Sequence, residues 1–591
     1  MSQANNTSAN NTNTNNLSQP DLIKYDLLLV GGSSSNLILA HRLLDLAAQS
    51  GLELSIAILE KAPQFGGHIV SGAITNPQVI AKLFPDYETN GFPMEGKVTK
   101  NHLSVLGSLQ KWDLPDPVIP RGFRKEGYVI LSLSHVIRWL AEQLVEKAKG
   151  IPSVVLDLFP GFAAHEILYS GDRVIGTRVT DMGSEAEDVI YADITCFGDK
   201  GFISKDLVEK FHLRPNPQLW SVGVKEVWQI PTDHQGQVWH TLGYPVLDGT
   251  FSGGFVYGLK DNRLSVGLIL GLDSANPNLN PQQRLQDFKA HPWIQDLLKG
   301  GKMLKYGAAV IPEGGYYSLP NRFGVSGAIL LGDALGVLDV GSLAGVDKAM
   351  ETGYIAAGLL HDAFLTGDLE IEPAYRQAVM EGFVGQDLYS SRYFREAFLE
   401  NSRLLEEYLP SVCNEVDKGH PWLGSVKFGL ASPVRRSMDV IRALSMLTGR
   451  VGSQTPIPTY VPCHDGIEPA FEARHTVNTH QVRQTSSFYS RPDAVFYASP
   501  RYHEGNQHIQ EFSAEVCQSC IATYDKLHRP TPCVSDCTAD VHQVGSLEGI
   551  RLHHMSLENC IQCRTCEIVC PHLNLRVNPS YEGSGPDFFG L

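Results

Sequence analysis

The sequence lacks the features that would place it in several large protein classes. None of its 591 residues lies in an apolar run of about 18 residues, so we expect no transmembrane helix. Residues 1–20 carry no charge and no apolar core, which argues against a secretory signal. Basic residues are in deficit, with 48 Lys and Arg against 64 Asp and Glu and a net charge of −16. Because nucleic-acid-binding proteins normally carry a basic surplus, that class is disfavoured.

The length and composition predict several domains. A chain of 591 residues exceeds what one core usually holds, and 43% apolar with 19% charged residues is globular composition. The first twenty residues are mostly Asn, Ser and Thr and predict a disordered leader. After that leader (1–20) we expect an α/β domain over 21–400, a helical and loop region over 401–510, and a cysteine-rich domain over 511–591.

Cysteine is scarce over most of the chain and crowded near its end. Eight of the 11 cysteines lie between Cys517 and Cys570. Without an export signal the thiols should face a reducing compartment, where clustered cysteines are more often metal or cluster ligands than disulfides. The other three, Cys196, Cys413 and Cys463, are predicted to be small buried apolar residues.

The last four cysteines have the spacing of a cluster-binding loop. Cys560, Cys563, Cys566 and Cys570, followed by Pro571, form C-x2-C-x2-C-x3-C-P, the bacterial ferredoxin run for a [4Fe–4S] cluster. Three thiolates of such a loop reach three irons of one cluster. In two-cluster ferredoxins the fourth cysteine of each run binds the other cluster. A zinc or purely structural site is the alternative.

The four cysteines upstream repeat the pattern with a longer middle gap. Exchange of the last ligand between the two runs divides the eight cysteines into two sets. Set A is Cys537, Cys560, Cys563 and Cys566. Set B is Cys517, Cys520, Cys533 and Cys570. Each set is predicted to bind one [4Fe–4S] cluster. For set B, a zinc site or unused thiols are the alternatives.

The start of the α/β domain has the pattern of a dinucleotide-binding turn. An apolar strand over 25–30 precedes a Gly-rich turn over 31–36, a helical segment over 37–49 and a second strand over 54–59. Glu60 ends that second strand, where an acid can bind the ribose hydroxyls. The predicted fold class is therefore α/β, or mixed α+β, with a Rossmann-like domain.

The turn departs from the usual glycine pattern. Gly31 and Gly32 open it, but Ser33 takes the second glycine position and Asn36 the third. The alternative is an ordinary loop in a fold that no longer binds a nucleotide. A second nucleotide-type feature lies far downstream, where a predicted strand over 328–331 delivers Gly332 and Asp333 to a Gly-rich loop. A carboxylate there can bind a hydroxyl of a cofactor, although a lone Gly-Asp pair is more often a turn.

Longer segments carry a resemblance to one family. They are Leu59–Ala73, Pro160–Ala164, Gly223–Trp228, Tyr306–Ala308 with Glu313–Gly315, Gly345 with Ala349–Met350 and Gly353, and Cys537–Val541. Over nearly its whole length after the leader, the chain resembles electron transfer flavoprotein–ubiquinone oxidoreductase.

The resemblance implies an oxidoreductase that carries electrons from reduced electron transfer flavoprotein to ubiquinone at a membrane surface, using FAD and one [4Fe–4S] cluster. FAD would lie between the turn at Gly31 and the loop at Asp333, and Lys61 lies in the first matching segment. The cluster ligands of the family correspond to set A. Gly253 and Gly254 lie in the segment that resembles the family's quinone-binding glycines, within an inserted β-rich domain. The C-terminal domain would be ferredoxin-like.

Departures from the family leave other interpretations open. The family's GAGPAG turn is GGSSSN here, its KIKG is Ser342–Gly345, and it usually has Asp where Cys570 stands. The stretch that should face the membrane, Val426–Leu447, contains five charged residues. It is predicted to be either a basic amphipathic helix on a membrane or a solvated helix docked on the core.

Three functions therefore remain open. The first is the family's electron transfer to ubiquinone, with a peripheral location on the cytoplasmic side of the inner membrane or in the cytoplasm. The second is a soluble flavin-dependent reductase or dehydrogenase with another acceptor. The third is a non-catalytic iron–sulfur relay that has lost FAD. No nucleic acid is expected as a partner.

Overall fold

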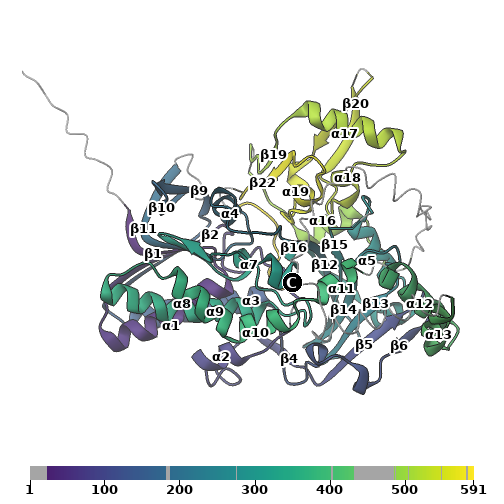
Figure 1. The fold of residues 1–591 in the computed structure, drawn as a ribbon, viewed down its shortest axis with the longest axis horizontal. Coiled ribbons are helices and arrows are strands. Elements are labelled where there is room, and N and C mark those ends of the chain that lie inside the picture. Colours follow the sequence, from purple (N-terminus) through teal and green to yellow (C-terminus); the bar gives the residue numbers. More distant parts are fainter. Residues whose placement is uncertain are drawn as a thin grey trace, which may run out of the picture.

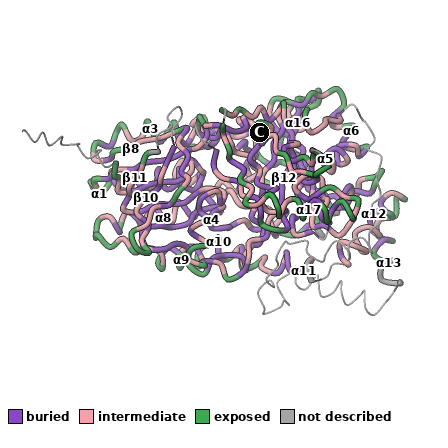
Figure 2. Tube along the Cα trace, turned by 90° about the horizontal axis from the view of Figure 1, so that it is seen from above, coloured by how far each residue is buried: buried purple, intermediate pink, exposed green. Residues whose placement is uncertain are grey.

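The fold is mixed α/β. The computed structural model describes residues 23–591 except 73, 181–186, 275, 401–402, 432–484, 486, 504, 548 and 581–582. Figure 1 shows two large sheets with helices around them and a cysteine-rich region above the second sheet. The buried residues follow the strands of both sheets, and many exposed residues lie on the outer helices (Figure 2).

The first sheet is Rossmann-like. Its eight strands follow the order β17-β18-β11-β1-β2-β8, with β10 and β9 added beside β11. The bounds are β1 Lys24–Val30, β2 Leu54–Glu60, β8 Val154–Pro160, β9 Ala163–Ser170, β10 Arg173–Thr180, β11 Glu187–Phe197, β17 Gly324–Val325 and β18 Ala328–Leu330. The central strands run parallel. Their nearly continuous apolar sequences follow from burial on both faces.

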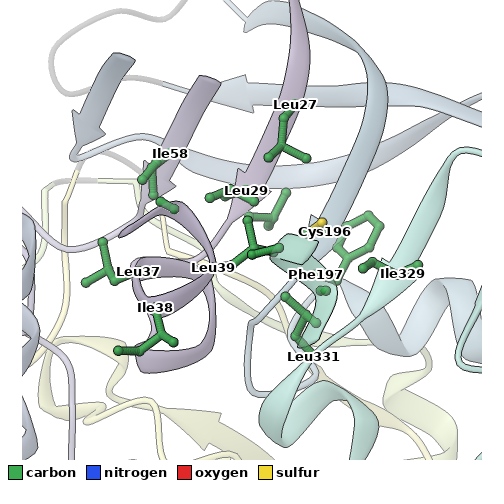
Figure 3. Close-up of a cluster of buried hydrophobic side chains, with 14 of the residues drawn as sticks. Leu27, Leu29, Leu37, Ile38, Leu39, Ile58, Cys196, Phe197, Ile329 and Leu331 are labelled. Atoms are coloured by element: carbon green, nitrogen blue, oxygen red, sulfur yellow. The ribbon is translucent and has the colours of Figure 1, made fainter. Parts of the chain in front are cut away.

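Three long helices pack beside this sheet. They are α1 (Ser34–Ser50), α3 (Leu133–Lys149) and α8 (Val346–Thr366). Helix α1 packs against both of the others. Leu27 and Leu29 of β1 and Leu37 and Leu39 of α1 belong to the resulting core. Figure 3 shows Leu29 close to Leu39. The predicted strand-turn-helix-strand order is confirmed, and the turn lies at the carboxyl end of β1, an interior strand of the sheet.

The second sheet has seven strands in the order β16-β12-β15-β14-β13-β5-β6. The bounds are β5 Lys100–Leu106, β6 Lys111–Asp113, β12 Trp220–Gln229, β13 Gln237–Gly243, β14 Ser252–Leu259, β15 Arg263–Gly271 and β16 Lys302–Pro312. Neighbouring strands are antiparallel except β13 and β5, which run parallel. The sequence pattern predicts sheet edges at 251–257 and 306–315. Strand β16 is an edge, but β14 lies inside the sheet because β13 pairs with its other side.

The cysteine-rich region is built from short elements. They are α16 Arg491–Ala498, β19 Ile509–Glu511, α17 Ala514–Lys526, α18 Pro532–Asp536, β20 His542–Leu547, β21 Ile550–Met555, α19 Thr565–Val569 and β22 Leu575–Val577. The region joins the second sheet through β16, where the Val310 N–H donates to the Cys563 carbonyl at 3.0 Å. The Tyr306 hydroxyl donates to the Thr538 carbonyl at 3.1 Å. These contacts place the cysteines against the sheet that forms one wall of the central cavity.

Two helix boundaries differ from the sequence prediction. Helix α1 begins at Ser34, three residues early, because Ser33 accepts a hydrogen bond from the Asn36 N–H and caps it. The predicted loop after Gly332 starts as a short helix, α7 (Gly332–Leu335). Among the described residues no helix has the length and hydropathy that a membrane span requires. Most of the predicted membrane-facing stretch, 432–447, lies outside the described residues.

Candidate functional site

The Gly-rich turn is held by its own backbone and by Glu60. Gly31 has φ +95°, which favours glycine, and its N–H donates to the Leu59 carbonyl at 2.9 Å. The Gly32 N–H donates to Glu60 Oε2 at 3.1 Å. A Cβ on Gly32 would lie 2.6 Å from the Phe65 ring and 2.7 Å from Glu60 Oε2. Gly31 and Gly32 are therefore required by the fold itself.

Polar side chains occupy the other two glycine positions. Asn36 is fully buried, and its Nδ2 donates to the carbonyls of Val30 at 3.0 Å and Gly31 at 2.8 Å. The Ser33 hydroxyl caps α1 and contacts the Ser35 hydroxyl at 3.0 Å. Ser33 and Asn36 thus stabilise the turn. The N-terminus of α1 still faces the space beyond the turn, where a phosphate could bind.

Gly353 allows a close contact between two helices. It lies in α8, and a Cβ there would be 1.9 Å from the Ser35 carbonyl oxygen of α1. Sequence reasoning did not single out the reason for this glycine, although an isolated glycine in a helical pattern is a signal for such a contact. The two helices approach closely because Gly353 has no side chain.

One cavity of about 460 Å³ joins residues predicted to bind flavin with residues predicted to bind quinone. Ser33 and Asp333 line it from the first sheet, and Gly253 and Gly254 line it from β14. The remaining predicted cofactor residues lie beside the cavity without lining it: Gly31, Gly32, Asn36, Glu60, Lys61 and Gly332. Gly332 (φ +53°) donates its N–H to the Thr352 hydroxyl at 3.1 Å, which aims Asp333 at the cavity.

Charged groups in this mostly apolar cavity have shifted pKa values. Burial raises the pKa of Asp333, and Asp199 adds to the shift while Lys200 opposes it. Burial lowers the pKa of Lys225 to about 8, with Glu95 opposing the shift. Lys125, Lys200 and Lys225 all line the cavity. Sequence reasoning missed these lysines, because only the fold turns them toward one space.

Glu60 and Lys61 connect the turn to the cysteine-rich region. Burial raises the pKa of the Glu60 carboxyl, although N–H groups of Ala62 and Gly32 donate to it. The Lys61 ammonium donates to Gln562 Oε1 and lies 4.4 Å from the centroid of the Phe202 ring. Lys61 therefore points toward the cysteine-rich region in this structure.

The cysteines of set A lie together between β16 and α19. Cys537, Cys560 and Cys566 are buried, and burial together with the neighbouring Cys563 raises the pKa of each thiol. Backbone N–H groups of Val541 and Gln562 donate to the sulfurs of Cys537 and Cys560, each at 3.3 Å.

The chemistry of set A fits an iron–sulfur cluster. Among the described residues, two groups of possible metal ligands have all their ligand atoms within 4.8 Å of one another: Cys533–His542–His553 and Glu511–Cys517–His553. Neither group contains three sulfurs of one set, so the sulfurs within each set are spaced more widely. Tetrahedral zinc with Zn–S bonds near 2.3 Å would bring its sulfurs to about 3.8 Å. The wider spacing and the N–H donors to sulfur favour a cluster.

The four cysteines of set B line one pocket on the far side of the same region, together with His553 and Asn574. No cysteine in the described part of the chain forms a disulfide. Cys196 and Cys413 are buried, as their isolation predicts, and Cys463 lies outside the described residues. The structure thus gathers the eight clustered cysteines into the two predicted sets, while metal binding by them remains a prediction.

The residues of the cavity fit a flavin. The N-terminus of α1, the buried carboxyl of Asp333 and apolar side chains all line the cavity. An elongated cofactor with a phosphate and a ring system requires such a lining. The fold and site together define a Rossmann-type flavoprotein with an added cysteine-rich domain. A geranylgeranyl bacteriochlorophyll reductase-like protein from Thermoplasma acidophilum has a similar fold, with TM-score 0.53 and 15% identity over 72% of this chain and 100% of that one.

Sequence comparisons narrow the class to one family. A family profile described as ETF-QO, ubiquinone-binding, matches residues 220–311. A probable mitochondrial electron transfer flavoprotein–ubiquinone oxidoreductase of Schizosaccharomyces pombe is 30% identical over 95% of this chain and 85% of its own length. The Pseudomonas aeruginosa electron transfer flavoprotein–ubiquinone oxidoreductase is 29% identical over 96% of this chain and 98% of its own length. The chain belongs to the electron transfer flavoprotein–ubiquinone oxidoreductase family, which confirms the resemblance found in the sequence.

Proposed function

We propose that the chain carries electrons from reduced electron transfer flavoprotein to ubiquinone, with FAD and a [4Fe–4S] cluster bound to set A. The observation that carries this proposal is the single cavity. It joins Ser33 and Asp333 on the flavin side to Gly253 within the segment that matches the ubiquinone-binding profile. Set A contacts the strand that forms part of the same cavity, through Val310 and Cys563.

The chain's own residues would hold FAD along the cavity. Ser33–Ser35 at the N-terminus of α1 line the cavity and would face the phosphates, and Asp333 would accept a hydrogen bond from the cofactor. When bound, FAD accepts or donates either one or two electrons, which suits the exchange between a one-electron centre and a two-electron quinone. The apolar walls exclude water from this space.

Two polar side chains in the cavity suit a quinone oxygen. The Tyr257 hydroxyl and His240 Nε2 lie 3.0 Å apart, and both residues line the cavity. Burial lowers the pKa of His240 to about 3, and Lys125 contributes. His240 is therefore neutral at pH 7, so it can hold a proton on one ring nitrogen without carrying a charge. Its Nδ1 has no hydrogen-bond partner among the described residues.

The location we propose is peripheral, on the cytoplasmic side of the inner membrane. Ubiquinone is apolar, and Leu242 both lines the cavity and is 39% exposed, so the cavity reaches the surface there. Helix α13 (Pro421–Ala431) exposes Trp422, Leu423 and Val426. It packs against η4 (Leu404–Tyr408), which also lines the cavity through Leu405. Exposed apolar groups beside a quinone entrance are the kind that enter a membrane surface.

Gly253 offers a direct test of quinone binding. A Cβ on Gly253 meets no atom closer than 3.5 Å, so a side chain fits the fold. Alternation along β14 puts it on the same face as the cavity-lining Phe255. We expect Gly253→Leu to lower reduction of decylubiquinone by reduced electron transfer flavoprotein about tenfold or more. Flavin and iron content should equal those of the wild type.

Gly253→Ala is the matched control and should retain most of the turnover, because a methyl group fills less of the cavity. Wild-type protein with intact flavin that does not reduce decylubiquinone would favour a soluble reductase with another acceptor. Purified protein with clusters but no flavin after acid precipitation would favour the relay without FAD. Either result would contradict the proposal.

A further inference from the structure

We propose that set B binds a second [4Fe–4S] cluster, so that the chain holds two clusters in one cysteine-rich region. The proposed electron transfer to ubiquinone needs only set A and does not require this site. The pocket beside α17 and α18 is lined by all four cysteines of set B and by none of set A. Figure 1 shows α17 at the outer end of the region, while α18 lies on its inner side.

Two matching helices build both sites. Helices α18 and α19 have five residues each, with one cysteine as the second residue and another as the C-cap. Cys533 and Cys537 occupy these positions in α18, and Cys566 and Cys570 occupy them in α19. The helices pack together. Set A therefore contains the cysteine at the start of α19 and the cysteine at the end of α18, and set B contains the other two.

This arrangement makes the two sites neighbours. Ligands four residues apart on one helix are separated by about 6 Å along its axis, so one helical turn joins set A to set B. Ser535 of α18 lies in that turn and is buried. The repeated construction is the reason to assign the same type of cluster to both sites, because equivalent positions of equivalent helices supply the ligands.

Hydrogen bonds to sulfur repeat as well. In set A the N–H of Val541 donates to Cys537, four residues before it, at 3.3 Å. In set B the N–H of Asn574 donates to Cys570, again four residues before it, at 3.2 Å. Such donors stabilise thiolates and cluster sulfurs and tune the cluster.

Asn574 also ties together the two distant parts of set B. Its Nδ2 donates to the Cys517 sulfur at 3.2 Å and to the Ser513 carbonyl at 2.7 Å. Its Oδ1 accepts the Ser513 N–H at 3.0 Å. Ser513 is the N-cap of α17, so one asparagine sets the start of that helix against the loop after Cys570. Asn574 is a positioning residue for set B.

Zinc is the competing occupant, and the geometry disfavours it. In the described part of the chain, no three sulfurs of set B lie within 4.8 Å of one another. The nearby groups with closer ligand atoms depend on His553. His553 contacts Glu511 and His542, which belong to the same groups, since its Nδ1 lies 2.6 Å from Glu511 Oε2 and its Nε2 lies 3.0 Å from His542 Nδ1. Each group contains only one cysteine of set B, so neither uses the four thiolates that line the pocket.

The position of set B extends the path between the cavity and the surface. Set A touches the cavity-lining strand β16 through Cys563. None of the residues that line the set B pocket lines the cavity, and Cys517 and Cys533 of set B are partly exposed. The order is cavity, set A, set B, solvent. A cluster bound by set B would exchange single electrons with a partner at the surface and with the cluster of set A.

Metal content and spectroscopy test this site without an activity assay. Anaerobically purified wild-type protein should contain about eight irons and eight acid-labile sulfides per chain, since each cubane holds four of each. The EPR spectrum of dithionite-reduced protein should be broadened by interaction between the clusters. The variant Cys517→Ala/Cys520→Ala should contain about four irons, lose the broadening and keep its flavin. Asn574→Ala, which keeps every ligand, should change only the signal of the second cluster.

Cys413→Ala is the matched control and should keep about eight irons, because Cys413 lies outside both sets. Flavin-loaded wild-type protein with about four irons, or with four irons and one zinc, would overturn the proposal. If the double variant does not fold, the wild-type counts decide alone. Failure of quinone reduction with eight irons present would refute the proposed function and leave the second cluster standing.

Discussion

At the residue scale, the turn at Ser33 and Asn36 shows how a departure from a motif is accommodated. The sequence pattern leaves open a loop that has lost its nucleotide. In the structure the Asn36 amide bonds two strand-end carbonyls, and Ser33 caps the following helix. Both substitutions therefore contribute to the fold, and the phosphate side of the turn still faces the cavity through Ser33.

We expect Asn36→Ala and Ser33→Gly to differ. Loss of the Asn36 amide leaves the Val30 and Gly31 carbonyls without that donor and should cost about 1–3 kcal/mol. Replacing the Ser33 cap by glycine costs only a few tenths of a kcal/mol and makes room for a phosphate. Thermal unfolding checks the first effect, and flavin released by acid, per mole of protein, checks the second. Ser33→Gly should raise the flavin content, and an Asn36→Ala variant as stable as the wild type would contradict this view of the turn.

At the scale of elements, close pairs of helices set the geometry of both kinds of site. Helices α1 and α8 meet at Gly353 and hold the turn against the cavity. Helices α18 and α19 meet in the cysteine-rich region and divide eight cysteines between two places. In the first pair, a glycine without a side chain allows the close contact. In the second pair, two five-residue helices each place one cysteine near the start and one at the end.

Gly353→Ala should be strongly destabilising. Its Cβ would lie 1.9 Å from the Ser35 carbonyl oxygen, a backbone atom that cannot rotate away, so α8 and α1 must separate. We expect a cost of about 3 kcal/mol or more, at the upper end for overpacking, with loss of flavin. Thermal unfolding and the flavin-to-protein ratio measure it.

Gly358→Ala, on the same helix, is the matched control. Its Cβ would meet only the flexible Arg42 side chain, at 3.3 Å, so the helix propensity of alanine should stabilise the protein by up to about 1 kcal/mol. Equal effects of the two substitutions would contradict the role assigned to Gly353.

At the scale of the whole molecule, the exposed apolar side chains of α13 and the cysteine-rich region lie apart. Figure 1 shows α13 at the lower right and α17 at the top. Leu242 lines the cavity and is exposed, and α13 with its exposed apolar side chains packs against η4, which lines the cavity through Leu405. The proposed membrane contact at α13 would therefore leave the cysteine-rich region free to meet a protein partner.

Removal of apolar groups from α13 should weaken membrane binding. Trp422 is 60% exposed, and the variant Trp422→Ser/Leu423→Ser should lower association with vesicles of phosphatidylcholine and phosphatidylglycerol about tenfold or more, because each side chain contributes up to about 2 kcal/mol when buried. Flotation of the holoenzyme with vesicles measures it. Phe496→Ser, which removes an exposed aromatic from α16, should bind like the wild type. Equal binding by all three proteins would exclude α13 as the contact.

The sequence by itself determined the local patterns. The strand-turn-helix-strand run over 25–59 follows from apolar spacing and glycine, and the cysteine spacings divide eight residues into the two sets that the structure gathers. The resemblance to the family rests on contiguous segments, and the comparisons confirm it. These features are readable because they depend on neighbours along the chain.

Only the tertiary structure decided which distant residues share one space. Asp333 and Gly253 line one cavity. Parallel pairing places β18, which precedes Asp333, beside β11, and pairing in the second sheet places β14 against the same cavity. An isolated glycine signals a close contact at Gly353, but neither it nor Asn574 indicates its partner locally, since packing brings each partner near. Long-range pairing and close approach of backbones, which no local spacing encodes, therefore set the geometry of this site.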